Sequence, residues 1–100
     1  SHRAILMRML RNLHAVYVER EDWARAVRCA DRVLKLVPDN PDALRDRGQG
    51  YLQLDHRLGA RADLGRYLML NPDADDAQAV RERGEMLRVS VAISGIARLN

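Results

Sequence analysis

The sequence contains one cysteine, Cys29, and so lacks the partner that an internal disulfide needs. A lone thiol fits a reducing compartment. No run of about eighteen apolar residues occurs, and the first residues show no signal-peptide pattern, so we expect neither a membrane segment nor export. These absences predict a cytoplasmic protein.

Aromatic side chains are also scarce. Phenylalanine is absent and aromatic residues make up 4% of the 100 residues, whereas alanine, leucine, arginine and aspartate are abundant. Strands favour aromatic and β-branched residues, and helices favour alanine, leucine and arginine. With 47% hydrophobic residues, the chain has enough apolar surface for one small folded domain. The composition therefore predicts a single all-α domain.

Signatures of catalysis and of metal or cofactor binding are missing. The sequence contains no HxxxH, no CxxC and no Gly-rich phosphate loop. His14 and His56 stand far apart in the sequence, and no histidine or acid is placed to activate Cys29. The acidic cluster at residues 73–76 lacks calcium-loop spacing and is better explained as the start of a helix. We therefore expect no enzyme activity, no metal site and no cofactor.

Basic charge is present but is not concentrated. All 17 basic residues except Lys35 are arginines, they are spread along the chain among 14 acidic residues, and the net charge is +3. Nucleic-acid binders more often cluster basic residues beside aromatic rings that stack on bases. The three tyrosines do not stand in such a cluster. Arginine-mediated nucleic-acid binding is therefore kept as the second of two alternative functions.

What the sequence does contain is a helix boundary that occurs twice. Pro38 ends a helix because its ring removes an amide donor and disfavours the α conformation at the preceding residue. Asn40 is suited to cap the next helix, and Pro41 to occupy its first turn. The stretch Leu70-Asn-Pro-Asp73 spells nearly the same boundary again.

The two boundaries belong to an internal repeat. Aligned with itself at an offset of 34 residues, the sequence has identical residues at Leu10/Leu44, Arg11/Arg45, Tyr17/Tyr51, Ala26/Ala60, Arg32/Arg66, Leu34/Leu68, Leu36/Leu70, Pro38/Pro72 and Asp39/Asp73. A 34-residue unit of two helices is the period of the tetratricopeptide repeat, and the chain resembles that family. The resemblance implies a right-handed superhelix of helix pairs, in which small residues such as Gly48 allow close approach.

The pattern predicts two units followed by a C-terminal capping helix, at about residues 7–40, 41–74 and 75–98. Within them we expect helices at about 3–20, 23–37, 41–54 and 57–70, and a last helix that starts between residues 73 and 76. The stretch Val89-Ser-Val-Ala-Ile-Ser94 also alternates like a strand, which leaves open whether residues 89–97 continue the last helix.

The wording of the repeats resembles one family more closely. Met9-Leu-Arg-Asn-Leu-His-Ala-Val-Tyr17, Leu36-Val-Pro-Asp39 and Arg45-Asp-Arg-Gly48 are similar to the C-terminal module of bacterial SirB-type transglutaminase-like proteins. The resemblance covers most of residues 7–76 and implies a preceding transglutaminase-like domain, whose activity cannot be carried over to this chain. The missing initiator methionine agrees with a C-terminal fragment of a larger protein.

The resemblance to tetratricopeptide repeats implies a non-catalytic module that binds a peptide or protein domain on its concave face, which the first helix of each unit lines. Equivalent positions on these helices form the predicted site, namely Arg8 with Asp42, Arg11 with Arg45, and Ala15 with Gln49. The Arg11/Arg45 pair makes a cationic ladder for an acidic or carboxylate-bearing segment, and neither arginine is expected to carry packing. A solvated arginine pair is the alternative explanation.

The first helix carries more apolar residues than packing against one neighbour requires. Ile5, Leu6 and Met9 are therefore predicted to contact another surface. Two occupants fit: the preceding transglutaminase-like domain, for which the module would be an intramolecular scaffold, and a second copy of the chain in a homodimer. The intramolecular scaffold is the first alternative function.

Overall fold

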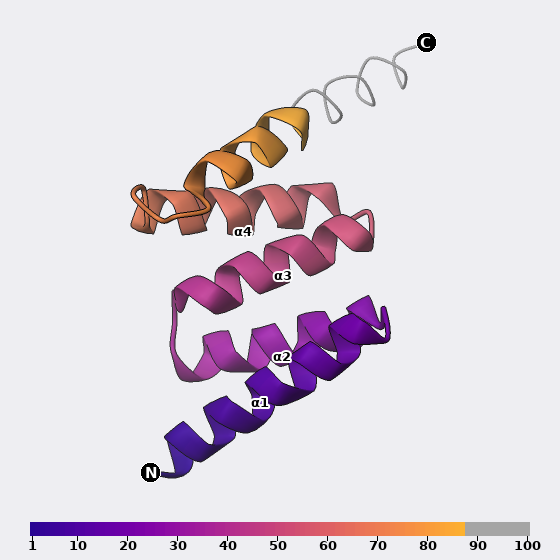
Figure 1. Cartoon of the computed structure of the whole chain (residues 1–100), viewed down its shortest axis with the longest axis vertical. Helices are drawn as coiled ribbons and strands as arrows, with labels where there is room; N and C mark the ends of the chain where they lie inside the picture. The colour runs from indigo at the N-terminus through magenta and orange to yellow at the C-terminus, as the bar shows by residue number, and fades with distance from the viewer. Residues whose placement is uncertain (88–100) are drawn as a thin grey trace.

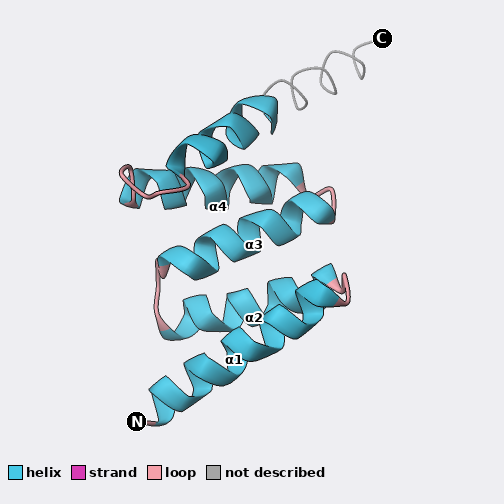
Figure 2. Ribbon diagram, in the orientation of Figure 1, coloured by secondary structure: helices cyan, strands magenta, loops and turns pink. Residues whose placement is uncertain are grey.

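The computed structural model describes residues 1–87, which form helices joined by short turns (Figure 1, Figure 2). The helices are α1 (His2–Glu19), α2 (Trp23–Leu36), α3 (Pro41–Gln53) and α4 (Arg57–Leu70), and residues 77–87 form a further helical segment. No strand occurs in this range, so the all-α prediction is confirmed. Each of the first four helices lies within one residue of its predicted bounds. The ambiguous stretch at residues 89–97 lies outside the described residues.

The predicted helix boundary between the two units is confirmed atom by atom. Asn40 Oδ1 accepts a hydrogen bond from the amide of Ala43 at 3.0 Å, and Pro41 occupies the first turn of α3. The start of α2 is capped in the same way, by Asp22 Oδ1 and the amide of Arg25 at 3.2 Å. Local chemistry alone therefore fixes where these helices begin.

The turns inside the two units close identically. The amide of Asp22 donates to the carbonyl of Tyr17, and 34 residues later the amide of His56 donates to the carbonyl of Tyr51, each at 2.8 Å. The residue before each donor has a positive φ, 56° in the first turn and 58° in the second. A left-handed residue closed by such a bond is the Schellman ending of a helix. The internal repeat is thus present in the backbone as well as in the sequence.

Each helix packs against the next one along the chain, so that the helices form a stack with α1 at one end (Figure 1). Small residues lie where helices meet. Ala26 and Ala60 are buried, and a Cβ on Gly48 would lie 2.7 Å from Cδ2 of Leu64. The larger core cluster consists of Leu44, Ala60, Leu64, Tyr67, Val80 and Leu87. Residues 77–87 therefore share a core with α3 and α4.

The last helical segment begins at residue 77, later than the predicted start at residues 73–76. Residues 72–76 form turns instead, in which the amide of Ala74 donates to the carbonyl of Asn71 and the amide of Ala77 donates to the carbonyl of Ala74. The delay has a structural reason, because the carboxylate of Asp76 is held by Tyr67, whose hydroxyl donates to Oδ1 at 2.5 Å.

The 34-residue correspondence also runs on into this segment, a signal that the pattern of two units and a cap does not use. The identical pairs are Asp42/Asp76, Ala43/Ala77, Arg47/Arg81 and Gly50/Gly84. Residues 77–87 are therefore related in sequence to α3, the first helix of the second unit.

Candidate protein-interaction surface

The largest groove in the described part of the chain has a volume of about 640 Å³ and runs over α1, α3 and the last helical segment. Its lining includes Ala15, Gln49 and Arg83, which stand 34 residues apart in succession. Equivalent positions of three successive units therefore face one hollow. Two of the predicted site residues, Ala15 and Gln49, are brought together here.

The groove has an apolar base and a polar rim. Val18 and the partly buried Trp23 supply apolar surface, and Gly50 keeps the base open because it carries no side chain. A Cβ on Gly50 would lie 2.6 Å from Cγ2 of Val27, so α3 approaches α2 closely at this point. The polar groups of the lining are His14, Glu19, Asp46, Gln49, Gln53 and Arg83. Such a surface suits an extended segment with an apolar side chain and hydrogen-bonding backbone groups.

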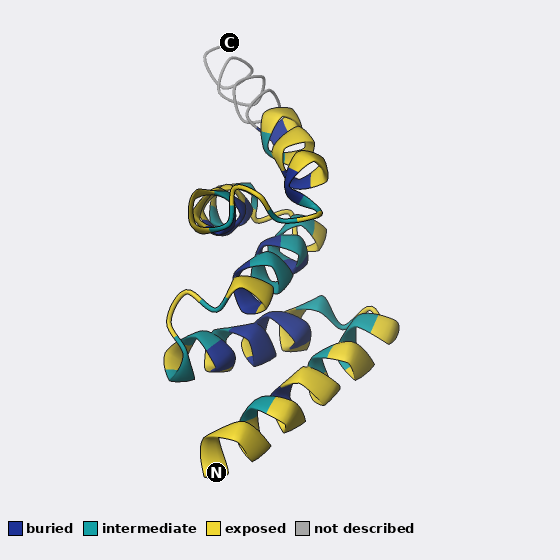
Figure 3. Ribbon diagram, turned by 60° about the vertical axis from the view of Figure 1, so that its left-hand side comes forward, coloured by how far each residue is buried: buried dark blue, intermediate teal, exposed yellow. Residues whose placement is uncertain are grey.

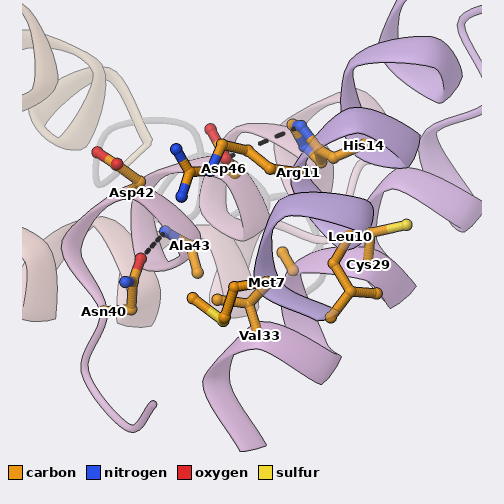
Figure 4. A pocket seen from close by; sticks show the side chains of 11 residues that line it. Met7, Leu10, Arg11, His14, Cys29, Val33, Asn40, Asp42, Ala43 and Asp46 are labelled. Atoms are coloured by element: carbon orange, nitrogen blue, oxygen red, sulfur yellow. Dashed lines mark hydrogen bonds and ion pairs between the residues drawn. The ribbon is translucent and has the colours of Figure 1, made fainter. Parts of the chain in front are cut away.

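A smaller cavity of about 40 Å³ adjoins the groove, and His14 and Asp46 line both (Figure 4). Nδ1 of His14 lies 3.8 Å from Oδ2 of Asp46. Burial raises the pKa of Asp46, and the nearby His14 and Arg45 oppose that shift. Two further predicted site residues, Arg11 and Asp42, line this cavity beside the apolar side chains of Leu10 and Val33.

The two arginines of the predicted ladder are in different environments. Arg45 is engaged within the fold, because its guanidinium lies 3.3 Å from a carboxylate oxygen of Asp42, 3.3 Å from one of Asp76, and 5.8 Å from the ring centre of Tyr67. Arg8 and Arg11 are exposed and make no hydrogen bond or ion pair within residues 1–87. The expectation that neither ladder arginine contributes to the fold is therefore wrong for Arg45, since α3 and the turn before residue 77 meet there.

A second arginine network was not predicted from the sequence. Arg47 donates to both oxygens of Asp63, which is buried, and to Asp31 at 2.9 Å. These hydrogen bonds raise the pKa of Arg47. The signals that could have revealed the network are the arginine at a position where the repeat family usually has leucine, and an aspartate on the apolar side of α4.

The remaining predicted contact residues lie on α1. Ile5, Leu6 and Met9 are all exposed. Cys29 is buried, and burial raises the pKa of its thiol, as expected of a packing residue. Within residues 1–87, no group of three His, Cys, Asp or Glu residues could hold a metal ion, and no helix is long and apolar enough to cross a membrane.

Comparison with known proteins identifies the repeat. A family model described as tetratricopeptide repeat matches residues 13–85. The chain belongs to the tetratricopeptide repeat family. The fold of this tetratricopeptide repeat chain also matches that of a solved structure, the C-terminal TPR-containing domain of a Plasmodium falciparum FK506-binding protein, with a TM-score of 0.76 and 24% identity. The match covers 98% of this chain and 61% of that one, and at this identity it shows the shared fold alone.

Two bacterial relatives of this tetratricopeptide repeat chain are longer than it. It is 62% identical over 80 residues to a UPF0162 protein of Xylella fastidiosa strain 9a5c, and 32% identical over 77 residues to a UPF0162 protein of Vibrio cholerae. These alignments cover 80% and 77% of this chain but 28% of each relative. The chain therefore spans well under a third of the length of the curated relatives it matches.

Proposed function

We propose that this tetratricopeptide repeat chain is a non-catalytic module that binds a peptide or protein segment in the groove lined by Ala15, Gln49 and Arg83. The supporting observation is that equivalent positions of three successive helices line one groove. Repeat proteins commonly use such extended surfaces for binding. The single buried thiol agrees with a reducing compartment, and we place the module in the cytoplasm.

The lining indicates what kind of segment binds. The amide side chains of Gln49 and Gln53 stand one helical turn apart on α3 and can bond to the backbone of an extended peptide. Trp23 and Val18 offer contact to one apolar side chain. Because the groove carries both Arg83 and the acids Glu19 and Asp46, net charge contributes less than shape and hydrogen bonding.

A peptide-library selection tests this proposal. Peptides enriched on the parent chain should bind Ala15→Trp more than tenfold more weakly, because an indole at position 15 fills the groove. Ala62→Trp is the matched control, since Ala62 is an exposed alanine on α4 outside the groove. Circular dichroism establishes that both variants keep the helical fold. Equal loss in both variants, or no loss in either, would place the binding surface elsewhere.

The first alternative is an intramolecular scaffold for a preceding transglutaminase-like domain. It is supported by the resemblance of the repeat wording to SirB-type proteins, and by the length of the relatives, of which the chain covers 28%. Supplying the rest of the full-length protein in trans tests it. Stable complex formation that survives Ala15→Trp would favour the scaffold over groove binding.

The second alternative is nucleic-acid binding through arginines, which the exposed Arg8 and Arg11 support. Several other arginines are held by carboxylates, among them Arg45, Arg47 and Arg66. A nucleic-acid complex would weaken steeply with salt and tolerate any sequence, whereas peptide binding in the mixed-charge groove would not. Anisotropy titrations of a labelled oligonucleotide at several salt concentrations distinguish the two.

A further inference from the structure

One side of α1 is apolar and uncovered. Ile5 is 50% exposed, Leu6 41%, Met9 54%, Leu13 41% and Val16 39%. Their spacing of three and four residues places Met9, Leu13 and Val16 along one side of the helix. In Figure 3 most of α1 is exposed, in contrast to α2, which packs between two helices. We call these five residues the α1 stripe.

The repeat shows what this side of the helix does elsewhere in the molecule. Met9, Leu13 and Val16 correspond at the 34-residue offset to Ala43, Arg47 and Gly50 of α3. All three α3 residues face α2. Ala43 belongs to a core cluster with Val33, Arg47 reaches Asp31 at 2.9 Å, and the missing Cβ of Gly50 makes room for Val27. The side that α3 turns towards the second helix of the preceding unit is therefore the side that α1 leaves open.

The side chains differ between the two helices, and the difference describes the missing neighbour. Where α3 has Ala43 and Gly50, α1 has the larger Met9 and Val16, so that a helix packed there must present small side chains or lie farther away. Where α3 has Arg47 bonded to Asp31, α1 has Leu13. The neighbour therefore needs no acid at that point and should be apolar along its contact face.

We propose that the α1 stripe packs against a helix with small apolar residues, carried by the part of the full-length protein outside these 100 residues and aligned on α1 as α2 is on α3. The relatives provide the length for it, because the chain covers 28% of them. A helix of the same polypeptide also has a higher effective concentration than a second copy of the chain. The stripe shares no residue with the groove lining, so this proposal and the groove proposal can fail separately.

Thiol labelling tests the proposal in the full-length protein and in the 100-residue chain. Cys29 is replaced by alanine, and Met9→Cys then introduces a single thiol in the stripe. Ala62→Cys on α4 is the matched control. We expect a small maleimide to label the stripe thiol at least tenfold more slowly in the full-length protein than in the short chain, with the rate at the control thiol changed less than twofold. Adding Leu13→Glu in the full-length protein should restore fast labelling of the stripe thiol, and Met69→Glu, an equally drastic change on exposed α4 surface, should not.

Two results would overturn the proposal. Equal labelling of the stripe thiol in both proteins would mean that nothing from the rest of the chain covers the stripe. Protection of this thiol in the short chain that grows with protein concentration and reaches the level in the full-length protein would assign the stripe to a second copy. The melting curve of the short Leu13→Glu variant shows whether the substitution disturbs the fold itself, and we expect no change because Leu13 is exposed.

Discussion

Arg47 of α3 grips the carboxylate of Asp63 on α4 with two hydrogen bonds, from Nε and Nη2, each 2.7 Å long. Asp63 is only 5% exposed, and the same guanidinium reaches Asp31 on α2. In the first unit the residues equivalent to Arg47 and Asp63 are Leu13 and Cys29, an apolar pair. The second unit thus has a charged link where the first has none, and this link joins three successive helices.

Removing the arginine alone should be costly. Arg47→Leu leaves the carboxylate of Asp63 buried without a partner, and we expect the free energy of unfolding to fall by about 3 kcal/mol. Urea denaturation followed by circular dichroism measures this loss.

The double variant Arg47→Leu with Asp63→Ala is the control for the charge itself. It imitates the apolar pair of the first unit and should recover most of the lost stability, because no unpaired charge remains. A double variant as unstable as Arg47→Leu would mean that the arginine acts by filling space rather than by pairing with Asp63.

Two glycines on neighbouring helices make a second matched pair. Gly48→Ala should destabilise the chain by about 1–3 kcal/mol, because the new Cβ would lie 2.7 Å from Cδ2 of Leu64, which is fully buried. Gly65→Ala meets no atom within 4 Å and should stabilise α4 by about 0.5–1 kcal/mol. Thermal melts of the two variants should therefore shift in opposite directions. A loss at both positions would show that helix spacing at Gly48 is not what the glycine provides.

Local chemistry made much of this fold predictable. The caps at Asn40 and Pro41 and the repeat period depend on neighbouring residues or on self-similarity, and both can be read along one chain. The placement of Ala15 and Gln49 in one groove followed from the same period. The ion pairs could not be found in this way. Arg47 and Asp63 are 16 residues apart and Arg45 and Asp76 are 31 apart, so their pairing depends on how two helices are rotated against each other.

The bond between Tyr67 and Asp76 should make stability depend on acidity. The hydroxyl of Tyr67 donates to Asp76, and this hydrogen bond lowers the pKa of the carboxyl. The unfolded chain then binds the proton more readily, so the stabilisation is fully present above the ordinary pKa of an aspartate and is lost as the pH falls through the lowered value. Tyr67→Phe should cost about 1 kcal/mol at pH 7 and less at about pH 2.

Unfolding free energies measured at several pH values test this prediction. Tyr51→Phe is the control, because no hydrogen bond of the Tyr51 hydroxyl occurs in residues 1–87. It should leave the slope of stability against pH below about pH 5 unchanged. If Tyr67→Phe keeps the slope of the parent, Asp76 draws its low pKa from Arg45 instead.

The last prediction separates the two arginines of the ladder. Arg45→Glu would place a carboxylate beside Asp42 and Asp76, which now pair with the guanidinium, and should lower the free energy of unfolding by about 1–2 kcal/mol. Arg11→Glu removes an exposed side chain with no partner in the described part of the chain and should change stability by less than about 0.5 kcal/mol. Because the ions around Arg45 are partly exposed, its loss should shrink in about 1 M salt. Melting temperatures of the two single variants at low and high salt check all three statements. Equal effects from both arginines would mean that they are equivalent surface charges, as their sequence positions alone imply. The predicted asymmetry would leave Arg11 as the member of the ladder that is free to meet an acidic partner.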